Sequence, residues 1–244
     1  MKTFKWLTLS LFVGSILILA LSEGYTVAYK NSDRMYVLAS SLNMRSQPSV
    51  KARKIATIPL GARVKVIKKT NKAYQSEGIK GHWVKVKYGK RIGYLFDGYL
   101  SKLPAPPKNS KSLKHYADSK LTKIGQEQKK VIEGKMDSKN PKDNIYPYHA
   151  KFLQKYKYNA KLQTEFMYDP RAIEVTSYTL IIKNISLEEG FLIGRLCRAG
   201  DKSFRNKAFK VNNSGTVELE GERGLLKVKK DSKGFVHIGF TLSL

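Results

Sequence analysis

The sequence predicts a mainly β protein, made of a small barrel, a partly helical linker and a second antiparallel β domain. Two observations support this. Hydrophobic residues make up 41% and aromatic residues 11% of the 244-residue chain, which is enough to form cores. Apolar and polar residues also alternate in short runs within residues 36–103 and again within residues 173–244. A period of two is typical of strands that bury one face and expose the other.

The chain begins with a predicted signal peptide over residues 1–22. Lys2 and Lys5 precede the uncharged run from Trp6 to Leu21, and small residues at Ala20 and Ser22 offer a cleavage site. An uncleaved membrane anchor is the alternative, although this run is shorter than the ~20 residues that span a bilayer comfortably. We therefore expect an extracytoplasmic protein, either periplasmic or secreted to the cell surface. It would touch a membrane only if the signal segment is uncleaved.

Short strands and turns fill residues 35–103. Val64 and Val66 alternate with Arg63 and Lys65, and turn residues such as Pro59–Gly61 separate the runs. Several short strands within about seventy residues predict a compact barrel or sandwich.

Residues 104–144 are predicted to be a linker that is helical in part. The cluster Pro104–Pro107 ends the preceding domain because proline cannot continue a sheet ladder. From about Ser110 to Lys135, apolar residues recur every three or four positions, at Leu113, Ala117, Leu121 and Ile124. This spacing indicates a helix that Gly134 could end.

Residues 145–244 are predicted to form a second β-rich domain, of no family that we recognise. The alternation is clearest in the last strand, where Val236, Ile238 and Phe240 lie on one face. About six such strands would form an antiparallel sheet. The apolar run Phe191–Leu196 is interpreted as a further strand, which would place Cys197 in the core.

Five segments of residues 35–103 carry a family resemblance. They are Leu42–Pro48 (LNMRSQP), Ile58–Gly61 followed by Val64 and Val66, Trp83–Val86 (WVKV), Gly93–Leu95 and Tyr99–Ser101. In this order they resemble the bacterial SH3 (SH3b, SH3-like) domain. The resemblance implies a small barrel that acts as a binding module in exported proteins and is associated with cell-wall peptidoglycan. The segment Lys68–His82 is longer than the family leads us to expect, and a longer loop could carry specificity.

The ligand-binding candidates combine cationic and aromatic side chains, which can bind anionic groups and flat sugar faces. They are Arg45, Tyr74, Trp83, Lys85, Tyr88, Arg91, Tyr94 and Tyr99. For Trp83, Tyr94 and Tyr99 the alternative is packing in the core or rim of the barrel, and Arg45 could instead bind loop carbonyls. Tyr74, in the long loop, is the first choice for an exposed contact.

The net charge predicts an anionic partner. The chain has 46 Lys and Arg against 19 Asp and Glu, a formal charge of +27, and residues 25–103 alone hold 17 basic and 3 acidic residues. In a cytoplasmic protein this charge would suggest nucleic acid, but the export signal argues against that partner. We expect peptidoglycan or another anionic envelope polymer as the ligand, with a protein partner possible for the C-terminal domain.

We expect a non-enzymatic binding protein without cofactor or metal. Cys197 is the single cysteine, which excludes an internal disulfide and a multi-thiolate zinc site, and the four histidines lack metal-binding spacing. Two alternatives stay open. One is a surface adhesin-type protein that binds acidic glycans or lipids, and the other is a wall hydrolase or transpeptidase with Cys197 as nucleophile.

Overall fold

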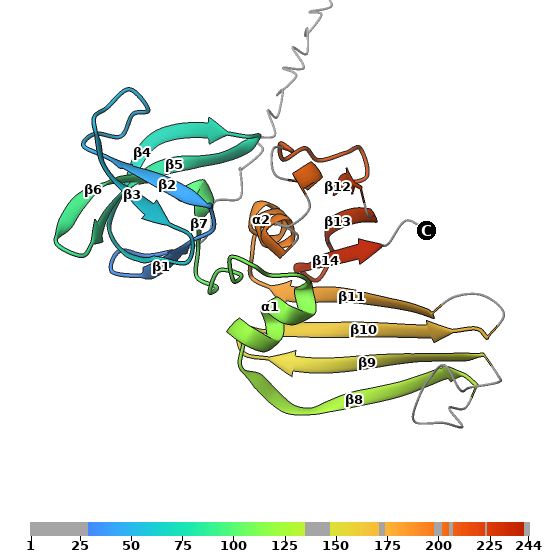
Figure 1. Ribbon diagram of the computed structural model, residues 1–244. Helices are drawn as coiled ribbons and strands as arrows, with labels where there is room; N and C mark the ends of the chain where they lie inside the picture. The colour runs from blue at the N-terminus through green and yellow to red at the C-terminus, as the bar shows by residue number, and fades with distance from the viewer. Residues whose placement is uncertain are drawn as a thin grey trace, which may run out of the picture.

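The computed structural model describes residues 29–134, 147–170, 174–197, 202–204, 207–222 and 224–241. It contains two antiparallel sheets of seven strands each, which confirms the predicted mainly β class (Figure 1). The predicted signal segment lies outside the described residues. No helix within the described ranges combines the length and the apolar character needed to cross a membrane.

The first sheet is curled, and its strands follow the order β3-β2-β6-β5-β4-β1-β7. The elements are β1 (Arg34–Val37), β2 (Ser41–Arg45), β3 (Lys54–Pro59), β4 (Arg63–Ser76), β5 (Ile79–Tyr88), β6 (Arg91–Phe96), the 3-10 turn η1 (Asp97–Tyr99) and β7 (Leu100–Ser101). Val64, Val66, Val84, Val86 and Leu95 are buried on its inner face. The alternation in the sequence therefore places the polar residues of β4 and β5 on the outer face.

The region after the first sheet contains a short helix, α1 (Leu113–Lys120), and then a long strand, β8 (Lys123–Glu133). The helix is shorter than predicted. Leu113, Ala117 and Leu121 are buried as a helical stripe requires, but Ile124 is 49% exposed and belongs to β8. Gly125 has a φ of +67°, which a helix does not accommodate.

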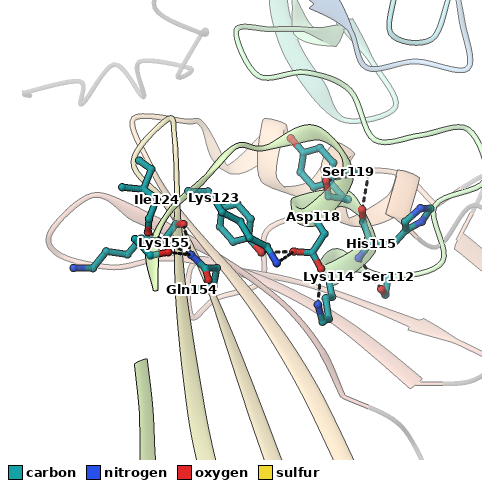
Figure 2. A network of polar contacts seen from close by, with 12 residues as sticks. Ser112, Lys114, His115, Asp118, Ser119, Lys123, Ile124, Gln154 and Lys155 are labelled. Carbon is teal, nitrogen blue, oxygen red and sulfur yellow. Dashed lines mark hydrogen bonds and ion pairs between the residues drawn. The ribbon is translucent and has the colours of Figure 1, made fainter. Parts of the chain in front are cut away.

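Polar contacts fix both ends of α1 (Figure 2). The Ser112 hydroxyl caps the helix by accepting a hydrogen bond from the His115 backbone N–H at 3.1 Å. Near its C-terminus, Asp118 forms ion pairs with Lys114 and, at 3.1 Å, with Lys123. Asp118 also accepts a hydrogen bond from the Tyr156 hydroxyl at 2.7 Å. Burial alone would raise the pKa of Asp118, but these donors outweigh it and lower the pKa to about 2.

The second sheet has the strand order β12-β13-β14-β11-β10-β9-β8. After β8 its elements are β9 (Tyr148–Tyr156), β10 (Ala160–Tyr168), β11 (Glu174–Lys183), α2 (Leu187–Cys197), the 3-10 turn η3 (Lys202–Phe204), β12 (Thr216–Gly221), β13 (Gly224–Lys230) and β14 (Phe235–Thr241). Helices α1 and α2 pack against this sheet, α1 on β11 and α2 on β13 and β14.

The predicted strand Phe191–Leu196 is wrong, because these residues lie in helix α2. A reciprocal cap starts the helix: the Ser186 backbone N–H donates to the Glu189 carboxylate, and the Glu189 N–H donates to the Ser186 hydroxyl, both at 3.1 Å. Gly190 lets the helix approach the sheet closely, since a Cβ there would lie 2.6 Å from Val236 Cγ1. Helix α2 is apolar on several faces because it is buried between the two sheets.

The cores of the two sheets form one continuous cluster of buried side chains. The tip of the β4–β5 hairpin extends to the second half of the chain. There, Arg195 of α2 forms an ion pair with Glu77 at 2.7 Å, and the Phe209 backbone N–H donates to the Glu77 carbonyl at 2.7 Å. The long segment Lys68–His82 thus forms part of the contact between the two halves.

Candidate functional site

The outer face of the first sheet carries a cross-strand row of cations with one aromatic ring. Lys85 of β5 lies opposite Lys68 of β4 on one side and Tyr94 of β6 on the other, and Tyr94 lies opposite Arg45 of β2. Directly paired residues of antiparallel strands project from the same face of a sheet. These four side chains therefore share one surface.

A second row runs parallel to the first, two residues further along the strands. Lys65 of β4 lies opposite Lys87 of β5 and opposite Arg34 of β1, and Lys87 lies opposite Ile92, which is 51% exposed. We call these two rows the basic face. Its cations are Arg34, Arg45, Lys65, Lys68, Lys85 and Lys87.

The carboxylates of residues 29–103 are all engaged away from the basic face. Asp33 forms an ion pair with Lys102 at 3.1 Å, and Glu77 forms its pair with Arg195. Asp97 is buried under the sheet, where it accepts hydrogen bonds from the Tyr29 hydroxyl at 2.7 Å and the His82 N–H at 2.6 Å. Burial raises the pKa of Asp97 although these donors oppose the change.

Within the part of the chain that the structure describes, no ion pair joins a carboxylate to any cation of the basic face. An array of exposed cations without counter-charges attracts anions because the fields of the cations add.

The structure brings some of the predicted site residues together on this face. Arg45, Lys85 and Tyr94 lie in the first row. Tyr88 and Arg91 lie opposite each other beside the β5–β6 turn, but alternation places them on the other face of the sheet, where Tyr88 packs against the core. Arg45 also donates a hydrogen bond to the Ala52 carbonyl at 2.8 Å, as its alternative interpretation supposed. The cations of this face that the predicted candidates did not include are Arg34, Lys65, Lys68 and Lys87. The alternation of Arg63 and Lys65 with Val64 and Val66 was a signal for Lys65, but Lys68 reaches this face only through a register shift after Val66 that the alternation does not indicate.

The other predicted residues, Tyr74, Trp83 and Tyr99, pack with Phe96 in an aromatic cluster. This cluster adjoins the first row, because Trp83 and Phe96 are the next direct pair on the same face beyond Lys85 and Tyr94. The Tyr74 ring lies 5.5 Å from that of Trp83 and 5.1 Å from that of Phe96, and the Tyr99 ring lies 5.4 Å from Phe96. Trp83 is 5% exposed, so packing describes it better than ligand contact. The expectation that Tyr74 lies exposed in a loop is wrong. Strands β4 and β5 continue their pairing to Ser76 and Ile79, and Tyr74 is half-buried within β4.

Cys197 lies at the end of α2 and is fully buried. Burial raises the pKa of its thiol far above the ordinary value, although a hydrogen bond with the Ser110 side chain opposes the change. A thiol in this environment stays protonated near neutral pH. Among the described residues, no group of three or more His, Cys, Asp or Glu side chains is arranged to hold a metal ion.

The curled first sheet, with the 3-10 turn η1 before its last strand, is an SH3-like half-barrel. The family model described as the bacterial SH3 domain matches residues 40–101, about a quarter of the chain. The resemblance seen in the sequence is thereby confirmed for this part of the molecule. A search of curated proteins and a search of solved structures each gave no match.

Proposed function

We propose that this protein is exported and binds peptidoglycan, or another anionic polymer of the cell envelope, through the basic face of its bacterial SH3 domain, without catalysing a reaction. The observation that carries the proposal is the set of two cation rows whose neighbouring carboxylates are all engaged elsewhere. Bacterial SH3 domains commonly bind the cell wall, which agrees with such a surface.

The chemistry of the basic face fits a polymer with repeated negative charges. Peptidoglycan presents peptide carboxylates and flat sugar rings. Ammonium and guanidinium groups form charge-assisted hydrogen bonds with carboxylates, while the Tyr94 ring in the first row can pack against a sugar or an aliphatic chain. Each exposed ion pair contributes only about 0.2–1 kcal/mol. Useful affinity must therefore come from several contacts made at once.

The environment of Cys197 supports the non-enzymatic part of the proposal. A cysteine nucleophile acts as a thiolate and must reach its substrate. The Cys197 thiol is enclosed in the shared core and has its pKa raised by burial. Substrate cannot contact it without local unfolding of α2.

The test is co-sedimentation of the purified protein with purified peptidoglycan sacculi over a series of salt concentrations. The first variant neutralises three cations of the basic face, as Lys65→Gln, Lys85→Gln and Lys87→Gln together. The matched control carries Lys155→Gln, Lys157→Gln and Lys229→Gln, which removes the same charge from exposed positions of the second domain. We expect the first variant to lose about 10- to 100-fold in affinity, from roughly 0.5–1 kcal/mol per contact. The control should lose no more than about threefold.

Equal losses in the two variants would contradict the proposal, because net charge alone would then explain binding. Salt separates the two cases further. Screening shortens the range of exposed charges to about 3 Å at 1 M salt, so a purely electrostatic attraction disappears there. Binding that persists at high salt and weakens on Tyr94→Ala indicates a shaped site.

The same assay addresses the adhesin-type alternative. Vesicles that contain anionic lipids and a soluble acidic polysaccharide serve as competing ligands. If either binds as tightly as sacculi, and the basic-face variant weakens that binding equally, the specificity is for surface negative charge in general. If sacculi bind more tightly, the wall polymer is the preferred ligand.

A further inference from the structure

Strand β8 is an open edge of the second sheet. Among the residues that the structure describes it pairs only with β9, and all eleven of its residues are exposed. The opposite edge, β12, is shorter and protected. Turn η3 packs on it through Phe204, which lies against Gly221, and the Asn212 backbone N–H donates to the Thr216 carbonyl at 2.8 Å. A long unprotected edge offers free backbone donors and acceptors to another strand.

The sequence of β8 is complementary to itself when read in opposite directions. If two copies are placed antiparallel with Gln128 opposite Gln128, Glu127 of each copy lies opposite Lys129 of the other. In the same register Ile124 lies opposite Ile132, and Lys123 lies opposite Glu133. Residues directly opposite in an antiparallel pair share a face, and opposite charges or apolar pairs there are favourable.

Most side chains in this register are available for such contacts. The exceptions are Lys129, whose ammonium lies 5.6 Å from the ring centroid of Tyr148, and Lys123, which pairs with Asp118. Within the described ranges, Glu127, Lys129 and Glu133 have no ion-pair partner. Ile124 is 49% and Ile132 45% exposed, so both have apolar surface that a second strand would remove from water. Pairing would cover the isoleucines and neutralise the charges.

Two features of β8 limit how much of it can form a regular ladder. Its pairing with β9 shifts register between Ile124 and Gln128 and again between Val131 and Glu133. We therefore assign the shared backbone ladder to the middle of the strand, around Gln128, and treat the outer pairs as side-chain contacts. The start of the strand is held in place by the ion pair from Lys123 to Asp118, and the Gln154 side chain donates to the Ile124 carbonyl at 3.3 Å (Figure 2).

We propose that two copies of this protein associate through β8, antiparallel and with the two-fold axis at Gln128, so that their second sheets join into one continuous sheet. Such an isologous contact closes on itself and yields a dimer. The proposal does not depend on the ligand of the basic face, since β8 and the basic face belong to different sheets.

The experiment is a charge exchange at the centre of the strand, measured by sedimentation velocity over a concentration series. In Glu127→Lys, two lysines oppose each other at each end of the central pair, and Lys129→Glu creates the corresponding carboxylate pairs. Each single variant should weaken dimerisation about tenfold or more, because like charges directly opposite are destabilising. The double variant, with both substitutions, restores the complementary pairs and should dimerise within about threefold of the original protein.

A mixture of the two single variants provides a second rescue. Its mixed pair has a lysine opposite a glutamate at both positions, so we expect dimers to appear on mixing two proteins that are each monomeric. Glu220→Lys, at an exposed position of the opposite edge, makes the same charge change as Glu127→Lys and should leave dimerisation unchanged. The proposal is overturned if the unaltered protein is monomeric throughout the series, or if the single variants and Glu220→Lys dimerise equally well.

Discussion

The two sheets contain the same number of strands but differ in how many of their basic residues form ion pairs with acidic residues. Residues 25–103 hold 17 basic and 3 acidic residues, and residues 145–244 hold 17 basic and 10 acidic residues. In the second sheet several acids pair with bases, as Glu218 does with Lys227 at 2.6 Å and Glu165 with Lys151 at 3.1 Å. In the first sheet the few acids are directed elsewhere. Among the described residues, an equal number of cations thus leaves a face of cations without ion-pair partners on the first sheet, whereas the larger number of acids lowers the net charge of the second region.

The two sheets also close their apolar faces differently. The first sheet curls so that its own strands enclose Val64, Val84 and Leu95. The second sheet stays open and depends on α1 and α2 for cover (Figure 1). The second sheet should therefore be more sensitive to changes in a helix than the first sheet is to changes outside its strands.

The largest effect on stability is expected from a substitution of Phe191, because this residue belongs to the helix that covers the second sheet. Its ring is fully buried in α2, 5.5 Å from the ring of Phe209. Phe191→Ala should lower the free energy of unfolding by about 3–5 kcal/mol, because it removes buried apolar surface and leaves a cavity. Chemical denaturation measures the loss. Ile92→Ala, at an exposed position of the first sheet, is the control and should change stability by less than about 0.5 kcal/mol.

A smaller effect is expected at Glu189, which lies where the two halves meet. Burial raises the pKa of Glu189 to about 7 from an ordinary 4.5, against hydrogen bonds from Ser101 and Ser186. Glu188 raises this pKa as well, and Lys102 lowers it. Because the folded pKa exceeds the unfolded one, the stabilising contribution is complete below pH 4.5 and is lost as the pH rises through 7.

Between pH 4.5 and pH 8, Glu189 should lower the free energy of unfolding by about 2–3 kcal/mol, at about 1.4 kcal/mol per unit of pKa shift. We therefore expect the Glu189→Gln variant to lack this part of the pH dependence. The glutamine can still accept the capping hydrogen bond from Ser186. Unfolding curves at several pH values give the measurement. A variant that retains the full pH dependence of the original protein would assign that dependence to other groups.

The smallest effect on stability is expected at Tyr74, which tests how much a half-buried side chain contributes to the first sheet. Its ring packs on Trp83 and Phe96 but is only half-buried. Tyr74→Ala should lower the free energy of unfolding by about 1–2 kcal/mol. Tyr74→Phe keeps the ring and should be nearly neutral. If Tyr74→Ala instead weakens binding to sacculi without changing stability, Tyr74 is a ligand contact after all.

Local patterns in the sequence predicted the strands of the first domain well, since alternation and turn residues are set by nearby positions. The cation rows were only partly predictable. Which residue lies opposite Lys85 depends on the lengths of the β4–β5 and β5–β6 hairpins, and that information is not local.

The two errors in element type have identifiable physical origins. The apolar run of α2 fits a buried strand or a buried helix equally well, and the pair Ser186 and Glu189 was the sequence signal that favours a helix start. The second error is the helix predicted to run on into β8. The helical spacing of Leu113, Ala117 and Leu121 happens to continue to Ile124, although Ile124 lies in strand β8. Gly125 was the residue that argued against extending the helix.

The contacts at Glu77, at the tip of the β4–β5 hairpin, affect the orientation of the second sheet when the protein is held on a polymer. Because the tip is fastened to Arg195 and Phe209, the basic face has a fixed direction relative to the second sheet. A protein held on a polymer through the basic face would therefore point its second sheet at a defined angle to that polymer. Attachment would set orientation as well as position, which a domain on a flexible tether does not do.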